Sequence, residues 1–465
     1  MSLPSQIRVL LLGSVALVAL LGGCVGDPAK SPSDAGSTGG NAATAGTTGT
    51  GGGTGTGGLT GTGGTSGSGG SAGNAGSAGG TVGSAGMTGT GGVAGMGGVG
   101  GAGASCAKTL FGRYLLRNDG ALLYESDPPA TVQTTVLDAA TGFPLMGVTA
   151  AAEDLSHGCA VLGASGTVWC WRTAANGNAV GQLADGTINA AGPLFRATQV
   201  LVAPNQPLGN VASLAATEPS GYLAGTSCAI TTDGKYYCWG DLTWIVNGGG
   251  ASLPSPYAVQ ITTDGVTPLT GVIQAAVNGI YGCAITQGAS ARELSCWGYN
   301  QSGQLGTGDI TARRYPTKIL GTLNPTKVVV QGSVAGTTCA VDSGSVRCWG
   351  YNAQGQAGTG TTSAPILAPT LVTLMGGATA VTGVLDISAG EGGNYPGVSC
   401  VLTTSHTVLC WGQGYMAYPT VYGITNIVAL GHVSAYVNDN RVWFLTSDGL
   451  YHIDSTTRSP NCGLL

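Results

Sequence analysis

Cysteine is the residue whose spacing in this sequence points most directly to chemistry. Thirteen cysteines occur, and ten of them form five pairs whose members are 9 to 13 residues apart. Paired thiols can be oxidised to a disulfide or can bind zinc as thiolates. A closed zinc site needs four ligands, and no partnering histidine or second cysteine pair stands near these pairs, so no metal site is predicted. The pairs are Cys159 with Cys170, Cys228 with Cys238, Cys283 with Cys296, Cys339 with Cys348, and Cys400 with Cys410.

Each pair brackets a short polar turn between two apolar segments, which is the pattern of a β-hairpin. Cys228 and Cys238, for example, lie symmetrically around Asp233 in "CAITTDGKYYCWG". Directly opposed residues of a non-hydrogen-bonded strand pair have Cα atoms roughly 4.5 Å apart, a separation that suits a disulfide. We therefore predict a disulfide across each of the five hairpins. The alternative is that the cysteines stay reduced and pack as small apolar residues.

The hairpins repeat along the chain at a nearly constant interval. Successive first cysteines are 55 to 69 residues apart, which suffices for one four-stranded sheet per repeat, and periods of this size indicate the blades of a propeller. Two further hairpins lack the cysteines but keep apolar strands around an Asp-Gly turn. They are "YLLRNDGALLYES" from Tyr114 and "VWFLTSDGLYHID" from Val442. Seven units are therefore predicted.

The segment that follows the hairpins carries a family signature. "WGYNQSGQLGTG" from Trp297 and "WGYNAQGQAGTG" from Trp349 resemble the end of the repeat in the regulator of chromosome condensation family, and the second departs only at Ala357. The resemblance covers residues 111–455 unevenly, because the third unit has "DLTWIVNGGG" and the sixth has "QGYMAYP" at this place. It implies an all-β fold, a seven-bladed β-propeller of four-stranded antiparallel blades.

The chain before the repeats has two parts with their own composition. Residues 1–23 combine Arg8 with a short apolar run and end in "LGG" before Cys24, which resembles a bacterial lipoprotein signal peptide; an ordinary signal peptide is the alternative. Residues 24–104 are rich in Gly, Ser, Thr and Ala and are predicted to be a disordered tether with a reach of roughly 50 Å. The propeller is assigned to residues 105–465, and Cys24 is predicted to carry the lipid.

Charge and compartment restrict the partners of the propeller. The net charge is −5 and no basic run occurs, which argues against a nucleic-acid partner because such binding depends on neutralising phosphates. Disulfides form in oxidising compartments, in agreement with export. We predict an outer-membrane lipoprotein of a bacterial envelope, exposed to the periplasm or at the cell surface, whose contact with the membrane is through its lipid anchor only.

The histidines and carboxylates form no recognisable catalytic set. His157 stands beside Cys159, where the family repeat usually has a structural histidine, and no Ser or Cys nucleophile lies at motif spacing from His432 or His452. The Asp residues of the hairpin turns have the ordinary role of Asx-turns. We therefore predict a protein that is not an enzyme and that needs no cofactor.

Function is expected on the loops that depart from the repeat. Trp244 in the third unit and Tyr415 and Tyr418 in the sixth are the candidate binding residues. The main hypothesis is a non-enzymatic recognition scaffold that binds an unknown protein. The alternative is a propeller that binds or cleaves a glycan, which needs aromatic side chains converging on one face. Guanine-nucleotide exchange, as in eukaryotic relatives of the family, is a remote alternative for an exported chain.

Two cysteines remain once the lipid site and the hairpins are assigned. Cys106 precedes the first unit and Cys462 follows the last, and these two units lack a hairpin disulfide. We predict that Cys106 and Cys462 bond to each other and close the ring. The alternatives are that both stay free thiols or that Cys106 pairs with a neighbouring molecule.

Overall fold

The computed structural model divides the chain into two units, residues 1–80 and 81–465. It describes residues 107–458 apart from gaps at 112–113, 126–132, 154–155, 176, 189–190, 217–224, 250–251, 322, 333, 364, 376, 393–394, 413–418, 422–425, 437–438, 448–450 and 454–455. All the described residues belong to the second unit. The predicted signal peptide (1–23), the tether (24–104) and the start of the propeller at 105 lie outside the described residues and stay predictions.

The described part of the chain contains β-strands and no helix. Six sheets are antiparallel, four-stranded and built from consecutive strands, as expected for propeller blades. We number the sheets 1 to 7 in chain order, and sheet 2 is the exception. The fourth strand is the outermost in each of the six, and β15 begins at Pro254, in agreement with the rule that proline is tolerated at sheet edges.

The strands have the following bounds. Sheet 1 contains β1 (Ala107–Phe111), β2 (Tyr114–Arg117), β3 (Leu122–Glu125) and β4 (Gln133–Thr135), and sheet 2 contains β5 (Leu137–Asp138), β6 (Val148–Glu153), β7 (His157–Leu162), β8 (Thr167–Arg172) and β9 (Arg196–Gln199). A separate pair consists of β10 (Leu201–Ala203) and β11 (Gln206–Pro207). Sheet 3 contains β12 (Val211–Ala216), β13 (Thr226–Thr231), β14 (Tyr236–Asp241) and β15 (Pro254–Gln260), and sheet 4 contains β16 (Val272–Val277), β17 (Tyr281–Gln287), β18 (Arg292–Gly298) and β19 (Arg313–Lys318).

The remaining three sheets follow the same order. Sheet 5 contains β20 (Pro325–Gln331), β21 (Thr337–Asp342), β22 (Ser345–Gly350) and β23 (Ile366–Leu371). Sheet 6 contains β24 (Val384–Gly392), β25 (Tyr395–Thr403), β26 (Val408–Gly412) and β27 (Thr420–Val421). Sheet 7 contains β28 (Ile427–Tyr436), β29 (Asp439–Thr446), β30 (Tyr451–Ile453) and β31 (Thr456–Arg458).

Sheet 2 departs from the predicted four antiparallel strands. Its order is β5-β9-β8-β7-β6, and the additional outer strand β5 runs parallel to β9. Strand β5 follows β4 of sheet 1 almost directly along the chain. Residues 133–135 pair with β3, and residues 137–138 pair with β9. This short segment therefore joins sheets 1 and 2 through main-chain hydrogen bonds, which no local sequence pattern indicates.

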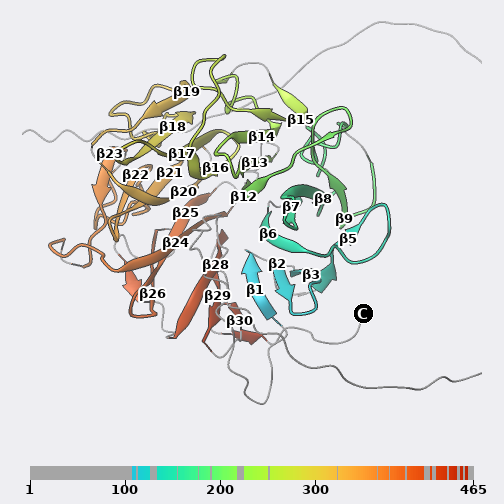
Figure 1. Ribbon diagram of the computed structural model, residues 1–465. Helices are drawn as coiled ribbons and strands as arrows, with labels where there is room; N and C mark the ends of the chain where they lie inside the picture. Colours follow the sequence, from blue (N-terminus) through green and yellow to red (C-terminus); the bar gives the residue numbers. More distant parts are fainter. Residues whose placement is uncertain are drawn as a thin grey trace, which may run out of the picture. The chain divides into compact units, whose positions relative to one another are not determined.

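The sheets follow one another around a ring, with their first strands innermost (Figure 1). Each first strand contacts the first strand of the next sheet, in the order β1, β6, β12, β16, β20, β24 and β28, and β28 also contacts β1. The apolar cores lie between adjacent sheets, since each core cluster contains residues of two neighbours.

The alternation of side chains along a strand explains this core. Cys348 and Trp349 are adjacent in β22, so they point to opposite faces of sheet 5. Trp349 packs on the disulfide of sheet 4, and the Cys339–Cys348 disulfide packs against Trp411 of sheet 6. Both tryptophans are fully buried. Each sheet of this kind thus presents a disulfide to the sheet after it and a tryptophan to the sheet before it.

The connections divide between two faces of the ring. We call turn face the side with the hairpin turns between the second and third strands. The first strand of the next sheet begins against such a turn, since Val272 N donates to Gly234 O at 3.0 Å and Val384 N to Gly344 O at 3.1 Å. We call exit face the opposite side, where the exit loops join third and fourth strands.

Candidate interaction surface on the exit face

The regular exit loops are held together by two buried amide side chains. In exit 4 (residues 299–312), Asn300 Oδ1 accepts from Leu305 N at 2.9 Å, and its Nδ2 donates to the carbonyls of Asp309 and Thr311 at 2.9 and 3.0 Å. Gln304 Oε1 accepts from Ser302 N at 2.9 Å. Both side chains are fully buried. These bonds replace the lost water at Asn300 and at Gln304 Oε1, whereas Gln304 Nε2 has no hydrogen-bond partner among the described residues.

Exit 2 (residues 173–195) and exit 5 (residues 351–365) repeat this arrangement with their own residues. Asn178 accepts from Leu183 N at 3.1 Å in exit 2, and Asn352 accepts from Ala357 N at 2.9 Å in exit 5. Ala357, which replaces the leucine of the family signature, is fully buried in the core between sheets 5 and 6. The repeated spacing of the exits therefore encodes a folded loop.

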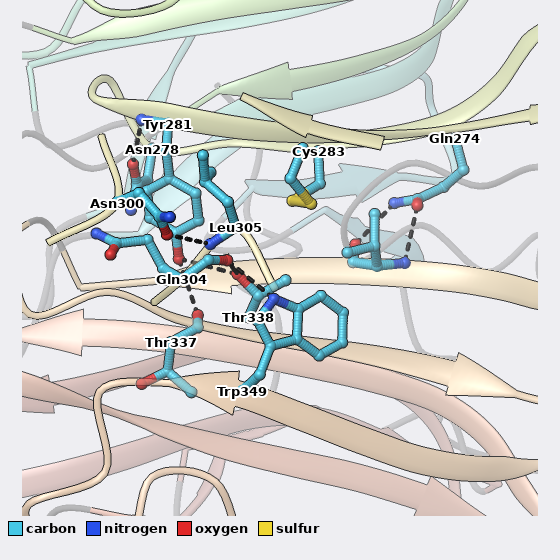
Figure 2. Close-up of a disulfide and its surroundings, with 12 residues drawn as sticks. Gln274, Asn278, Tyr281, Cys283, Asn300, Gln304, Leu305, Thr337, Thr338 and Trp349 are labelled. Carbon is cyan, nitrogen blue, oxygen red and sulfur yellow. Dashed lines mark hydrogen bonds between the residues drawn. A yellow bond between two sulfur atoms is a disulfide. The ribbon is translucent and has the colours of Figure 1, made fainter. Parts of the chain in front are cut away.

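Each regular exit also locks the next sheet in place. Figure 2 shows the lock between sheets 4 and 5, where the main-chain carbonyl of Gln304 accepts from Trp349 Nε1 at 2.9 Å and from Thr338 Oγ1 at 2.7 Å. Gln182 O accepts from Trp239 Nε1, and Gln356 O accepts from Trp411 Nε1, each at 2.9 Å. The tryptophan that fills the core between two sheets thus also bonds to the exit of the preceding sheet.

Gly306 allows this close approach, and its substitution gives a first prediction. Its φ is +67°, and a Cβ there would lie 2.7 Å from Trp349 Nε1, whereas Gly360 has a similar φ of +77° with open space around a Cβ. We expect Gly306→Ala to cost about 2–3 kcal/mol of unfolding free energy and Gly360→Ala about 1 kcal/mol, because only the first combines strain with a clash. Denaturant midpoints measure both. Equal costs would contradict the clash.

Exit 3 (residues 242–253) docks in the same way despite its different sequence. Ile245 O accepts from Trp297 Nε1 at 3.0 Å, so a residue outside the family pattern supplies the carbonyl. Trp244, a predicted binding residue, is half-buried and meets Tyr299 of sheet 4 edge-on, with ring centroids 5.1 Å apart and an interplanar angle of 85°. A Cβ on Gly249 would lie 2.6 Å from the Trp244 ring, so the ring also packs on this glycine.

A cation packs on the same loop as Trp244. Arg314 is exposed, a Cβ on Gly248 would lie 2.9 Å from its own Cβ, and its guanidinium lies 5.3 Å from the ring centroid of Tyr315. The neighbouring Arg313 is neutralised by Asp309 at 2.6 Å. The pKa of Asp309 is lowered, first by the Thr311 main-chain N–H and then by Arg313.

Arg314 itself has no carboxylate partner among the residues that the structure describes. We call the group Trp244, Tyr299, Arg314 and Tyr315 the Trp244 patch. Sequence reasoning pointed to Trp244 but missed the other three residues. Tyr299 belongs to the regular signature, and the adjacent arginines are typical of an ordinary solvated loop.

The structure has disulfides across the five hairpins. The Cα atoms of each pair are 4.0 to 4.2 Å apart. The two cysteines of a pair face each other as direct partners of the second and third strands. The bonds are Cys159–Cys170, Cys228–Cys238, Cys283–Cys296, Cys339–Cys348 and Cys400–Cys410, the same five pairs that the spacing predicts.

The remaining predicted site residues lie outside the described part of the chain. They are Cys24, Cys106, Tyr415, Tyr418 and Cys462. The lipid on Cys24 and the Cys106–Cys462 bond therefore stay predictions. Tyr415 and Tyr418 stay candidates for binding, and no geometry connects them with Trp244.

His157 lies in the core and not at a surface site. It is fully buried, its Nε2 is 2.6 Å from Ser227 Oγ of sheet 3, and its Nδ1 is 3.3 Å from Ser156 Oγ. Burial lowers its pKa to about 3, so the ring is neutral at ordinary pH. Its place between sheets 2 and 3 agrees with a structural role.

The low pKa of His157 leads to a prediction of pH dependence. The unfolded chain, with a histidine pKa of about 6.5, takes up a proton that the folded chain refuses, so stability falls as the pH drops below about 6.5. We expect a loss of about 2 kcal/mol between about pH 7 and 5, measured by denaturant unfolding. His157→Asn should flatten this part of the pH profile. An unchanged profile in that variant would assign the dependence to other groups.

Neither a metal centre nor a membrane-spanning helix is found in the described residues. These residues contain no group of three or more His, Cys, Asp or Glu side chains that could hold a metal ion. They also contain no helix that is long and apolar enough to cross a membrane.

Comparison with known proteins shows which family the repeat resembles. The repeat model of the regulator of chromosome condensation (RCC1) family matches residues 294–341, which run from β18 through exit 4 into β21. Prp20p of Saccharomyces cerevisiae superimposes with a TM-score of 0.51 at 13% identity, covering 70% of this chain and 79% of Prp20p. The fold is an RCC1-like propeller. Human WBSCR16 gives a TM-score of 0.48 at 17% identity, covering 71% of this chain and 82% of WBSCR16.

A curated relative shares part of the RCC1-like sequence. The human E3 ubiquitin-protein ligase HERC2 is 29% identical over 154 residues, which are 33% of this chain. The chain spans about 3% of the length of HERC2, in human and in mouse.

Proposed function

We propose that the chain is a seven-bladed RCC1-like propeller, held on a bacterial outer membrane by a lipid on Cys24, that binds another protein through its exit face and is not an enzyme. The count of seven blades is supported by sheet 2, whose strands β6 to β9 pair antiparallel in sequential order once the added strand β5 is set aside. The contacts of seven first strands, including β28 with β1, support it further.

The Trp244 patch is the observation that carries the proposed binding. Trp, Tyr and Arg are the residue types most enriched at the energetic centres of protein interfaces. Here Trp244, which is half-buried, meets Tyr299, and the exposed Arg314 packs on Gly248 of the same loop with its guanidinium over Tyr315. The packed aromatic pair offers a surface for an apolar side chain, and Arg314, which has no carboxylate partner among the described residues, can bind a carboxylate. This combination suits a protein partner that presents an apolar side chain beside a carboxylate.

Related propellers agree with a protein partner. Yeast RCC1 (Prp20) is known bound to Kap60, and Prp20p has binding properties toward Gsp1p and histones. These partners belong to that protein. For this chain we take over only the class of partner, a protein.

The disulfides support the proposed compartment. Five buried disulfides form and persist in an oxidising environment, as in the periplasm or at the cell surface. Replacement of Cys24 by Ser tests the anchor: the protein should then leave the membrane fraction or stay unprocessed. Unchanged fractionation together with unchanged processing would refute the anchor and leave the binding proposal intact.

Affinity capture from envelope extracts tests the binding proposal. We expect Arg314→Glu to abolish capture of the partner with an unchanged melting temperature, since Arg314 is exposed. Lys318→Glu, a charge reversal at an exposed site on the same strand β19, is the control and should capture normally. It also removes the Lys318–Glu293 pair at 2.8 Å, which contributes little to stability because both side chains are exposed. Equal capture by both variants would place the binding surface elsewhere.

The aromatic pair also favours the glycan alternative, because sugars bind against partly exposed aromatic rings. The same kind of variant separates the two ligands. A glycan ligand should survive Arg314→Glu and be lost in Tyr299→Ala, whereas the protein partner proposed here needs both residues.

A further inference from the structure

The junction between sheets 3 and 4 lacks a main-chain bond that both neighbouring junctions have. At the junction of sheets 2 and 3, Gly186 N in exit 2 donates to Pro256 O of β15 at 3.0 Å. At the junction of sheets 4 and 5, Gly308 N in exit 4 donates to Leu367 O of β23 at 3.0 Å. Each bond ties an exit to the outermost strand of the next sheet.

The equivalent strand residue at the junction of sheets 3 and 4 is Arg314. Pro256, Arg314 and Leu367 each precede by three positions the residue that pairs with the second cysteine of their hairpin. Among the residues that the structure describes, no main-chain N–H of exit 3 donates to the Arg314 carbonyl. The outermost strand β19 is therefore not tied to exit 3 in this way.

The glycine that could make this bond is present in exit 3 but donates elsewhere. Gly186, Gly249 and Gly308 each follow by four positions the residue whose carbonyl accepts from a core tryptophan. Their φ values are similar, at +90°, +96° and +85°. Gly249 N, however, donates to Thr243 O within exit 3 at 2.9 Å. The altered exit 3 thus uses this N–H internally and leaves the Arg314 carbonyl without it.

This carbonyl belongs to the one cation of the Trp244 patch. Arg314 is exposed and lies in β19, the outermost strand of sheet 4. An outermost strand with unpaired main-chain groups can pair with a strand of another protein. Pro316 has no N–H, so such pairing is confined to a short part of β19. Arg314 can therefore offer a main-chain acceptor and a side-chain cation to the same partner.

An apolar hairpin tip extends the Trp244 patch at Tyr315. Residues 261–269 form a hairpin after β15, closed by a bond from Leu269 N to Ile261 O at 2.8 Å. A Cβ on Gly265 would lie 2.7 Å from Tyr315 Oη, so the tip touches the patch. The next residue, Val266, is 85% exposed. The tip therefore adds an apolar side chain to the surface around Arg314.

The tip is held in place by its own polar groups. Asp264 Oδ1 accepts from Val266 N and Thr267 N at 2.9 and 2.6 Å, and Oδ2 accepts from Thr267 Oγ1 at 2.8 Å. The pKa of Asp264 is lowered, first by the Thr267 N–H, so this carboxylate stays ionised and bonded within the tip. A group that is ordered before binding loses little conformational entropy on binding. Val266 can therefore contact a partner at a low entropic cost.

We propose that the partner binds this junction through an extended peptide segment, whose main-chain N–H donates to the Arg314 carbonyl in place of the missing exit glycine. A carboxylate of the segment pairs with the Arg314 guanidinium, and its apolar side chains contact the Trp244–Tyr299 pair and Val266. This inference rests on the proposed binding at the Trp244 patch and adds the form of the partner. Strand addition needs an extended backbone, which distinguishes it from contact with a folded surface.

Selection of displayed peptides tests this form of partner. Random linear peptides of about twelve residues on phage are selected against the full-length protein with its disulfides intact, and synthetic copies are measured by fluorescence anisotropy. We expect peptides that carry Asp or Glu beside apolar residues. Arg314→Glu should weaken their binding about tenfold or more and Val266→Ser about threefold, whereas the control Lys318→Glu should bind normally.

An ester scan of a selected peptide tests the main-chain bond itself. Replacement of one amide by an ester removes one N–H and keeps the backbone extended. We expect one position at which the ester weakens binding about fivefold or more, because that N–H donates to the Arg314 carbonyl. Esters at the adjacent positions, whose N–H groups point away from β19, should have smaller effects.

Three results would overturn the inference: selection of no linear peptide, equal binding to the Arg314→Glu and Lys318→Glu variants, or an ester scan without a sensitive position. A protein that forms a dimer, and loses it in Arg314→Glu, would instead assign the edge of β19 to a second copy of the chain. Failure of the peptide experiments while capture of an intact protein still depends on Arg314 would contradict this inference alone and leave the proposed function standing.

Discussion

Reduction and alkylation of the five hairpin disulfides should unfold the propeller at about 37 °C. Each bond joins residues 9 to 13 positions apart. The chain-entropy model gives about 2.7 kcal/mol for such a loop, and five of them give about 13 kcal/mol, which is comparable with the whole stability of a typical domain, about 5–15 kcal/mol. Circular dichroism with and without reductant measures the loss.

Two controls separate the disulfides from other effects of the treatment. Alkylation without reduction should leave the melting curve unchanged, because the bonded sulfurs are protected. Cys339→Ala with Cys348→Ala should cost about 2–3 kcal/mol alone, since it removes one loop closure and two buried sulfurs. A fully reduced protein with the native melting temperature would show that core packing alone stabilises the fold.

Trp349→Ala should destabilise the propeller more than any of the other single substitutions, by about 3–5 kcal/mol of unfolding free energy. The side chain is fully buried between sheets 4 and 5, packs on the disulfide of sheet 4 and donates to Gln304 O at 2.9 Å. Its removal leaves a cavity and deprives the Gln304 carbonyl of one of its hydrogen-bond donors. Chemical denaturation followed by fluorescence measures the cost.

Trp349→Phe and Trp169→Ala are the companion variants. The phenylalanine keeps much of the packing but cannot donate, so we expect roughly 1–2 kcal/mol. Trp169 lies in the same kind of strand but is half-buried, and its removal should cost less than that of Trp349. Equal costs for Trp349→Ala and Trp169→Ala would contradict the role of the buried tryptophan as a lock between sheets.

The hairpins and their faces could be predicted because they depend on local alternation. Alternation along β13 places Cys228 and Ile230 on one face and Ala229 on the other, and these residues lie in separate cores on either side of sheet 3. A period of two residues determines this arrangement once the strand is identified. The cysteine pairs also indicate the register of the two strands, because a disulfide across a hairpin requires its two cysteines to lie directly opposite each other.

The remaining features depend on contacts between distant residues. The parallel strand β5 pairs with β9, about 59 residues away, and nothing in "LD" at 137–138 indicates this. The main-chain carbonyl of Ile245 takes the place of the glutamine carbonyl of the regular exits as the acceptor for Trp297. Every residue type has such a carbonyl, so the sequence does not indicate which one accepts. Trp244 was predicted as a binding residue, but its contacts with Tyr299 and Gly249 could not be predicted, because they depend on how two loops fold against each other.

The most direct test of the proposed recognition scaffold is a hydrogen-exchange footprint of the propeller in complex with its captured partner. The account predicts protection of residues 242–249 and 299–315 at the Trp244 patch, with unchanged exchange at the hairpin turns of the turn face around residues 117–120 and 163–166. Protection confined to those turns, with none at the Trp244 patch, would contradict it.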